Sequence, residues 1–402
     1  MSDYTTNGKG QNTMGKKLQP KLRFRGFTDA WEQRKLGDIL SYEQPYEYIV
    51  SSDDYSPVAR TPVLTAGKTL ILGYTNEADG VKAATKDSPV IIFDDFTASS
   101  HIIDYSFKVK SSAMKILSLR DSENDLYCIY YALTRIIRPS ASHERQWISK
   151  YARATVTVPS KDEQQVIGDF LRKLDRLIAA EKRKLDLWKK KKTALLRQIF
   201  EQKLRFKGYS DFWEQHKLGS LGNSYSGLSG KNKADFGHGL ASYITYMNVF
   251  QNSIADIDGN GQIEIDSKQH AVQYGDALFT ISSEKPEEVG MSSVWLGNQK
   301  NVYLNSFCFG YRQNGAFDAL YLAYMLRSEA VRSQMRMLAQ GISRFNISQH
   351  KVMDINVTIP SISEQQKIGS FCRGLDQLIS AEMKKIDLLM LKKKALLQQM
   401  FV

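Results

Sequence analysis

The sequence has few cysteines and no long apolar run, and each shortage excludes a class of protein. Its 402 residues include three cysteines, Cys128, Cys308 and Cys372, which are too few and too scattered for a disulfide framework. No stretch approaches the roughly 18 apolar residues that span a bilayer, and Met1–Lys17 lack the apolar centre of a signal peptide. We therefore expect a cytoplasmic protein without a membrane partner, and a flexible polar tail over residues 1–20.

The motifs of common catalytic sites are also missing. The chain has no G-x-x-x-x-G-K-[ST] loop for ATP, no Asn-Pro-Pro or Asp-Pro-Pro of an amino-methyltransferase, and no Pro-Asp ahead of a Glu-x-Lys nuclease centre. Its six histidines show no metal-ligand spacing. We predict a chain without catalytic residues, without a metal site and without a cofactor of its own.

One segment resembles a calcium-binding loop. Asp256–Glu264 matches the first nine places of an EF-hand, but Ser267 stands where the bidentate glutamate is needed. We interpret Gly259-Asn260-Gly261 as a hairpin turn instead.

The charge of the chain is strongly positive. Lys and Arg outnumber Asp and Glu by 55 to 43, which gives a formal charge of +12 and favours an acidic partner such as nucleic acid. With 42% hydrophobic residues, the chain can bury real cores, and this excludes disorder as its main state.

The chain repeats itself. Leu22–Gly37, LRFRGFTDAWEQRKLG, returns as Leu204–Gly219, LRFKGYSDFWEQHKLG, and a second pair of matching segments begins at Pro159-Ser160 and Pro360-Ser361. Between these frames, Ser41–Trp147 shows no obvious likeness to Asn223–Phe345. Repeated frames around unlike inserts suggest that the two frames have the same function and the two inserts have different functions. The alternative is a gene duplication followed by drift.

The frames contain two heptad patterns. Apolar residues recur in steps of four and three from Ile167 to Ile199 and again from Ile368 to Met400. Polar residues occupy the remaining seam places: Glu181, Lys192, Glu382 and Lys393. We predict two helices of roughly 55 to 60 Å that pair with each other in antiparallel fashion. The alternative is that each helix packs only on its own domain.

Two lysine runs lie in these helices, Lys189–Lys192 and Lys392–Lys394. We favour a solvated face or a contact with a partner subunit over binding of DNA phosphate.

The inserts show the pattern of mixed α/β modules. We expect strands at 89–93, 113–117, 242–249 and 277–281, and helices at 125–137 and 317–338. The predicted fold class is α+β, with two mixed α/β domains joined by two long helices that pair as an antiparallel coiled coil, in a pseudo-two-fold tandem repeat. The expected parts are a tail (1–20), a first domain (21–160), a long helix (161–203), a second domain (204–360) and a second long helix (361–402).

The doubled frame resembles the specificity subunit of type I restriction-modification systems. The likeness rests on LRF-x-G-F/Y-x-x-x-WEQ-x-KLG, PS-x-x-EQQ-x-IG-x-F and LD-x-LI-x-AE running into KK-x-ALL-x-Q, each present twice, and covers nearly all of the chain after Gln19. It implies two target-recognition domains, each reading one half of a split, asymmetric sequence in double-stranded DNA, with the helices setting the spacer.

The same resemblance implies partners and their cofactors. The partners would be two methyltransferase subunits and, in the full enzyme, two motor-nuclease subunits, and these would bring S-adenosylmethionine, ATP and magnesium. A stand-alone regulator with two DNA-binding modules and a fused methyltransferase-specificity enzyme are the competing hypotheses.

Polar and basic residues on expected loops are the candidate DNA contacts. In the second module, Ser282, Ser283 and Lys285 follow a predicted strand, and Arg344 and Asn346 lie in a loop hinged by Gly341. Arg344 and Arg145 could instead anchor their loops to a neighbouring helix. The full set of candidates is Lys68, Tyr74, Lys82, Lys86, Thr97, Ser99, Ser100, His101, His143, Arg145, Gln146, Lys231, Asn232, Lys233, Ser282, Ser283, Lys285, Arg344 and Asn346.

Overall fold

A computed structural model describes residues 19–65, 69–138 and 144–401. Most of the predicted tail therefore lies outside the described residues. The chain forms two compact units, one of Met1–Lys182 with Lys385–Val402 and one of Arg183–Lys384.

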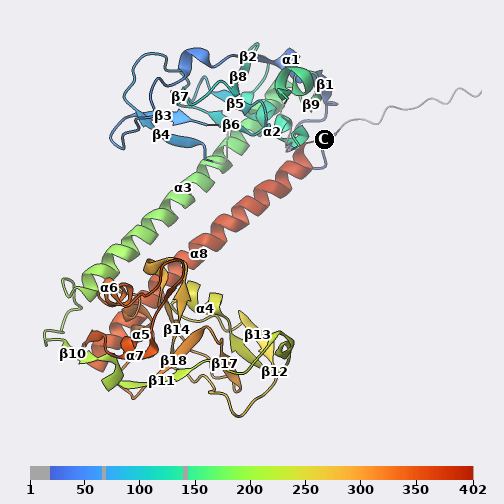
Figure 1. The fold of residues 1–402 in the computed structure, drawn as a ribbon. Coiled ribbons are helices and arrows are strands. Elements are labelled where there is room, and N and C mark those ends of the chain that lie inside the picture. The colour runs from blue at the N-terminus through green and yellow to red at the C-terminus, as the bar shows by residue number, and fades with distance from the viewer. Residues whose placement is uncertain (1–18, 66–68, 139–143, 402) are drawn as a thin grey trace, which may run out of the picture. The chain divides into compact units, whose positions relative to one another are not determined.

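Each unit combines one mixed α/β module with a stretch of both long helices. These helices, α3 (Lys161–Phe200) and α8 (Ile362–Met400), are drawn in green and red in Figure 1. Each has an acidic residue in its first turn and contains no proline, as the macrodipole and the backbone of a long helix favour. Among the described residues, no helix is both long enough and apolar enough to cross a membrane.

The described residues of the first module form three sheets, with strand orders β2-β8-β5-β6, β4-β3-β7 and β1-β9. Its strands are β1 (Glu32–Lys35), β2 (Leu40–Glu43), β3 (Thr61–Leu64), β4 (Ile71–Thr75), β5 (Val90–Asp94), β6 (Ser100–Ile103), β7 (Lys108–Val109), β8 (Met114–Leu119) and β9 (Thr155–Val158). Its helices are α1 (Leu36–Ile39) and α2 (Leu126–Ile136), and a π-helical turn covers Trp147–Tyr151.

The second module contains four sheets, with strand orders β11-β18-β14-β16, β13-β12-β17, β10-β20 and β15-β19. Its strands are β10 (Glu214–Lys217), β11 (Gly222–Ser226), β12 (Phe236–Ile244), β13 (Asn260–Ile263), β14 (Ala277–Thr280), β15 (Ser282–Ser283), β16 (Ser292–Val294), β17 (Val302–Leu304), β18 (Cys308–Gln313), β19 (Phe345–Asn346) and β20 (Asn356–Ile359). Its helices are α4 (Tyr246–Gln251), α5 (Ala319–Met325), α6 (Glu329–Met337) and α7 (Gln349–Met353).

The two modules share one topology although their inserts are unlike in sequence. In the four-stranded sheets, β8 lies between β2 and β5, and β18 likewise lies between β11 and β14. In each three-stranded sheet one pair of strands is parallel, β3 with β7 and β12 with β17. The predicted α+β class and tandem repeat are confirmed.

Three local predictions for the second module are wrong. Residues 242–249 are not one strand, because the hydroxyl of Thr245 accepts a hydrogen bond from the Asn248 N–H and starts α4. Residues 317–338 form two helices, since the backbone is extended at Ser328. Gly259-Asn260-Gly261 is not a hairpin turn, because α4 and the segment after it lie between β12 and β13, and Asn260 already belongs to β13.

The Glu-Gln-Gln motif of each frame ties the frame together. Glu163 is fully buried and accepts two hydrogen bonds of 2.7 Å from the Arg23 guanidinium and one of 3.2 Å from the Trp31 indole. Glu364 accepts the equivalent pair from Arg205 at 3.0 and 2.7 Å. Because a buried carboxylate left without its partner costs roughly 3 to 5 kcal/mol, these arginines are required by the frame.

The next residue of the motif joins the long helix to its module. The amide of Gln164 donates to the Pro159 carbonyl, and its oxygen accepts from the backbone N–H of Asp125, the N-cap of α2. Gln365 makes the same two bonds, to Pro360 and from Asp318, the N-cap of α5. The repeated sequence thus repeats a hydrogen-bond network.

The last turn of each long helix completes a core. In the second unit, Ile199 is buried in the main core, and the Phe200 ring lies 5.8 Å from that of Tyr321. In the first unit, Met400 and Phe401 are buried in the main core, with Phe401 6.1 Å from Trp31. Ile199, Met400 and Phe401, which are almost fully buried, each contribute roughly 1.5 to 3 kcal/mol by burial.

Charged pairs occupy the polar places of the seam. In the first unit, Asp175 binds both Lys393 and the hydroxyl of Tyr131. In the second unit, Asp376 likewise binds Lys192 and Tyr324. Burial and the adjacent carboxylate raise the pKa of both tyrosines.

Two further pairs complete the pattern, Lys385 with Glu181 in the first unit and Lys184 with Glu382 in the second. Each pair joins a residue of α3 to a residue of α8. As the residue numbers rise along α3, those of the paired residues in α8 fall, so the helices are antiparallel as predicted. Within the first lysine run, Lys189, Lys190 and Lys191 are exposed, as a solvated face requires, whereas Lys192 lies in the seam.

Asp376→Asn should destabilise the protein because it leaves the half-buried Lys192 without a charged acceptor. We expect Asp376→Asn to lower the free energy of unfolding by roughly 1 to 3 kcal/mol. When Lys192→Met is added, the double variant should lose less stability than the sum of the two single changes. Urea titration monitored by circular dichroism measures both. Lys190→Met removes an exposed pair with Asp186 on the same helix and should cost less than about 0.5 kcal/mol. Equal losses from the Asp376 and Lys190 changes would contradict the role of the seam pair.

Candidate nucleic-acid interface

A small sheet joins the two candidate loops of the second module. β15 pairs with β19 in antiparallel fashion, with Ser282 opposite Asn346 and Ser283 opposite Phe345. The structure therefore brings the predicted polar loop after β14 and the glycine-hinged loop into one place. Residues about 60 positions apart in the sequence share this surface.

Among the candidates on this surface, Arg344 and Asn346 are exposed. Arg344 makes no hydrogen bond or ion pair with another described residue. Ser282 and Ser283 are buried, and the Ser283 hydroxyl donates to Glu288. Lys285 is exposed and lies 3.4 Å from Glu288.

Two arginines of the second module, the buried Arg332 and the half-buried Arg327, hold the neighbouring segments through backbone carbonyls. Arg332 donates to the carbonyls of Glu287, Val289 and Gly290 at 2.7 to 2.8 Å. Arg327, between α5 and α6, donates to four carbonyls in the segments 249–252 and 292. Burial lowers the pKa of each to about 10. These contacts stabilise the loops under the candidate surface.

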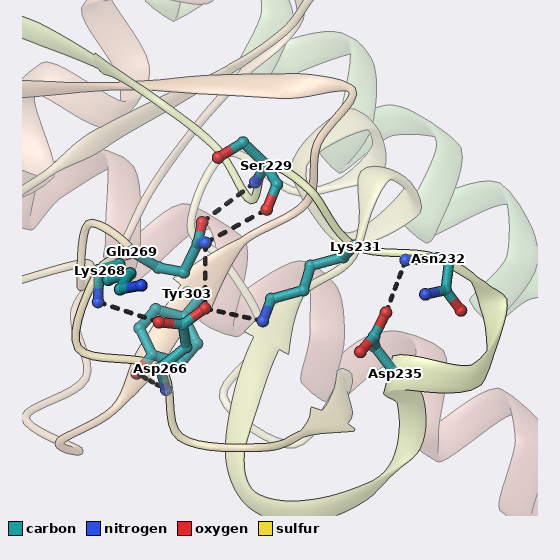
Figure 2. A network of polar contacts seen from close by, with 8 residues as sticks. All are labelled: Ser229, Lys231, Asn232, Asp235, Asp266, Lys268, Gln269 and Tyr303. Atoms are coloured by element: carbon teal, nitrogen blue, oxygen red, sulfur yellow. Dashed lines mark hydrogen bonds and ion pairs between the residues drawn. The ribbon is translucent and has the colours of Figure 1, made fainter.

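Lys231 belongs to a separate polar network near the β13-β12-β17 sheet (Figure 2). Its Nζ lies 2.7 Å from Asp266, and this hydrogen bond, with those from Lys268 and Gln269, lowers the pKa of Asp266 to about 2. The Gln269 side chain also bridges to both backbone groups of Ser229. Figure 2 shows the side chains of Lys231 and Gln269 and the backbone N–H of Lys268 meeting at Asp266, so Lys231 holds its own loop in place.

The neighbours of Lys231 differ in exposure and in partners. Asn232 caps a short helical turn in a capping box with Asp235. Lys233, in the same turn, is exposed and has no hydrogen bond from its side chain to the described residues.

A buried ion pair organises the candidate loops of the first module. Asp95 and Lys115 are both almost fully buried, 3.3 Å apart, and Lys115 also donates to Gln44. Asp95 accepts hydrogen bonds from the backbone N–H groups of Gln146 and Trp147 at 2.8 Å. The two loops are thus brought together here as well, by a different device from that of the second module.

The candidates on these loops play different roles. Gln146 is buried and its side chain donates to the Phe96 carbonyl, so it holds the loops rather than facing solvent. Thr97 is exposed in the turn between β5 and β6, and Ser99, Ser100 and His101 are half-buried beside it. Arg145 is exposed, whereas His143 lies outside the described residues.

The remaining candidates of the first module lie away from this turn. Tyr74 is exposed on β4, and Lys86 is exposed in the segment before β5. Lys82 forms an ion pair with Glu43 and lies over the Tyr48 ring. Burial acts to lower the pKa of Lys82, but the contacts with Glu43 outweigh burial, and the pKa is raised. Lys68 lies outside the described residues.

Sequence reasoning missed the residues that hold the loops. Asp95, Lys115, Arg327 and Arg332 were not among the candidates, although Lys115 within an otherwise apolar strand is a signal for a buried charged pair. Among the described residues, no group of His, Cys, Asp and Glu could hold a metal ion. The geometry is that of two modules, each presenting exposed polar side chains on anchored loops.

Comparison with known proteins places this arrangement in a family. A family model described as the type I restriction modification DNA specificity domain matches residues 28–187 and again residues 211–390. The chain belongs to the family of type I restriction-modification specificity subunits, as the resemblance in its frames implied.

Individual relatives agree with this assignment. The chain is 30% identical over 360 residues to the type I restriction enzyme EcoR124I/EcoR124II specificity subunit of Escherichia coli, which covers 86% of this chain and 87% of the relative. It is 19% identical over 404 residues to the type I restriction enzyme MjaVIII specificity subunit of Methanocaldococcus jannaschii, over 92% and 91% of the two chains.

Solved structures share the fold. The S subunit of a type I restriction-modification system from M. genitalium superimposes with a TM-score of 0.61 at 16% identity, over 96% of this chain and 99% of that one. A chain from work on complex assembly and conformational transition of the type I R-M system gives a TM-score of 0.53 at 13% identity, over 91% and 96%.

Proposed function

We propose that each module reads one half of a bipartite, asymmetric sequence in double-stranded DNA, and that the paired helices set the unspecified spacer. The observation that carries this proposal is one strand topology, built twice inside matching frames, with unlike exposed loops. Two scaffolds of the same core topology with different polar loops suit two different half-sites. The net charge of +12 favours a polyanionic partner.

The DNA-facing surfaces are proposed to be the anchored loops. In the second module these carry Arg344, Asn346 and Lys285, and in the first module Thr97 and Arg145. Lys86 and Lys233 are exposed and suit contacts with phosphate, which position the protein without reading sequence. The buried candidates are proposed to hold the loops in place rather than to contact DNA; these are Gln146, Ser282 and Ser283.

The chain is proposed to be non-catalytic and to direct partner subunits. Two methyltransferase subunits would dock on the frames and supply S-adenosylmethionine for adenine methylation, and two motor-nuclease subunits would supply ATP and magnesium chemistry. The lack of nucleotide-binding and methyl-transfer motifs in the sequence supports this division of labour.

Exposed leucines at equivalent places mark the proposed docking faces for the methyltransferase subunits. Leu177 is 43% exposed on α3, and Leu378, its counterpart in the repeat, is 52% exposed on α8. Leu187 and Leu388 form a second equivalent pair, and both are also exposed. Matching apolar side chains on the outside of both frames suit two copies of one partner.

Leu177→Ser and Leu378→Ser should each weaken the docking of one methyltransferase copy, because each removes apolar area from one of two equivalent faces. Native mass spectrometry of the chain with its methyltransferase partner should then show one copy retained by each single variant and none by the double variant. Lys182→Ser, an exposed change on the same helix, should leave two copies. Two copies on every variant would refute these faces as docking sites.

Exchanging Ser41–Trp147 for the corresponding insert of another specificity subunit should change one half of the methylated sequence only. The exchanged segment carries Asp95, Lys115 and Trp147 together, so the buried contacts that hold its loops travel with it. Sequencing of methylated bases in cells with the methyltransferase partner gives the readout. A change in both halves would argue against independent modules.

Arg344→Ala should relax the sequence preference at one position of the second half-site. If the guanidinium makes a bidentate contact to guanine, cognate binding should weaken by roughly 1 to 3 kcal/mol. If it binds phosphate, all sequences should weaken alike and the salt dependence should become shallower.

Affinity of the assembled methyltransferase for cognate and single-base variants at two salt concentrations separates the two kinds of Arg344 contact. Arg145→Ala is the matched control, since its effect should fall in the other half-site. Wild-type affinity of the Arg344 variant at both salt concentrations would remove Arg344 from the interface.

A further inference from the structure

The loop that carries Arg344 is a closed hairpin with a rigid base. The backbone N–H of Gln340 donates to the Asn346 carbonyl at 2.9 Å, and the Asn346 N–H donates back to Gln340 at 2.8 Å. Directly after the hairpin, Ile347 is buried in the core, and its N–H donates to the Ile281 carbonyl. The base of the hairpin is therefore held by both the sheet and the core.

The turn itself requires glycine. Gly341 has φ +140°, and a Cβ there would lie 2.0 Å from the Arg344 carbonyl oxygen. A side chain at this place would open the turn, since the nearest atoms are backbone. The segment between Gly341 and Phe345 is consequently a tight turn.

The tip of this hairpin is an isoleucine that the fold does not use. Ile342 is 97% exposed, whereas Phe345 at the base packs against the core. Single exposed apolar residues are common on protein surfaces. Ile342 differs because it projects from a rigid turn, two residues from the exposed Arg344, on the surface proposed to face DNA.

We propose that the hairpin enters the major groove and that Ile342 contacts the 5-methyl group of a thymine in the second half-site. This methyl is the apolar feature that the major groove presents at its base edges. Ile342 is then a specificity-determining residue that reads an A·T pair next to the position reached by Arg344. The inference rests on the proposed function, because it requires that this module reads DNA.

The test replaces each thymine of the second half-site, one at a time, by uracil, which lacks only the methyl group. The whole chain is used, assembled with its methyltransferase partner, on a duplex carrying the site that this enzyme methylates. Wild-type binding should weaken at one thymine. Ile342→Ala should weaken binding to the unmodified duplex by roughly 3- to 10-fold, as expected for losing about one buried methyl contact. Uracil at that same thymine should not weaken the binding of the Ile342→Ala variant any further.

Ile265→Ala is the matched control, because Ile265 is an exposed isoleucine of the same module outside the hairpin. It should show wild-type affinity and the wild-type response to uracil. Unchanged binding by Ile342→Ala, or an equal effect of uracil on variant and wild type at every position, overturns the inference. A wild-type complex that does not distinguish its site from a scrambled duplex would instead overturn the proposed function.

Discussion

Each module's core is completed by the last turn of a long helix, and the rest of the structure depends on this constraint. Ile199 and Phe200 do this in the second unit, and Met400 and Phe401 in the first. The frame then begins beside that helix end, since the N–H of Leu204 bonds to the Gln198 carbonyl and that of Leu22 to the Gln399 carbonyl. Neither long helix can shift along its partner without opening a core.

Polar pairs in the seam give this arrangement its register. A purely apolar seam would tolerate a shift of one heptad, whereas Asp175 and Asp376 each need a lysine and a tyrosine at defined places. Polar seam residues of this kind commonly specify alignment at some cost in stability. Two equivalent places break the apolar heptad pattern in each half of the sequence, Glu181 and Lys192 in the first and Glu382 and Lys393 in the second, so the repeat preserves the alignment as well as the helix.

The periodic and repeated features of the chain were predictable from its sequence. The frames, both long helices, their antiparallel pairing and several strands follow from patterns that local physics determines. The shared topology of the inserts was not visible, because Ser41–Trp147 and Asn223–Phe345 meet the same packing demands with different residues. The break at Ser328 was missed because apolar spacing continues across it.

The candidate site was predictable only in part, because burial depends on contacts between distant segments. The sequence indicated which loops carry polar residues, and the structure joins them through β15 with β19 and through Asp95 with Lys115. It did not indicate that Gln146, Ser282 and Ser283 are buried while Arg344 is exposed. Ile342 was overlooked because an apolar residue in a loop has no periodic signal.

The most direct test of the account is the spacer length of a variant with seven extra residues in both α3 and α8. One heptad in each helix keeps the seam in phase and adds about 10 Å, which corresponds to roughly three base pairs. Sequencing of methylated bases should show both half-sites unchanged and the gap between them longer by about three base pairs. An active variant with an unchanged gap would contradict the role of the paired helices.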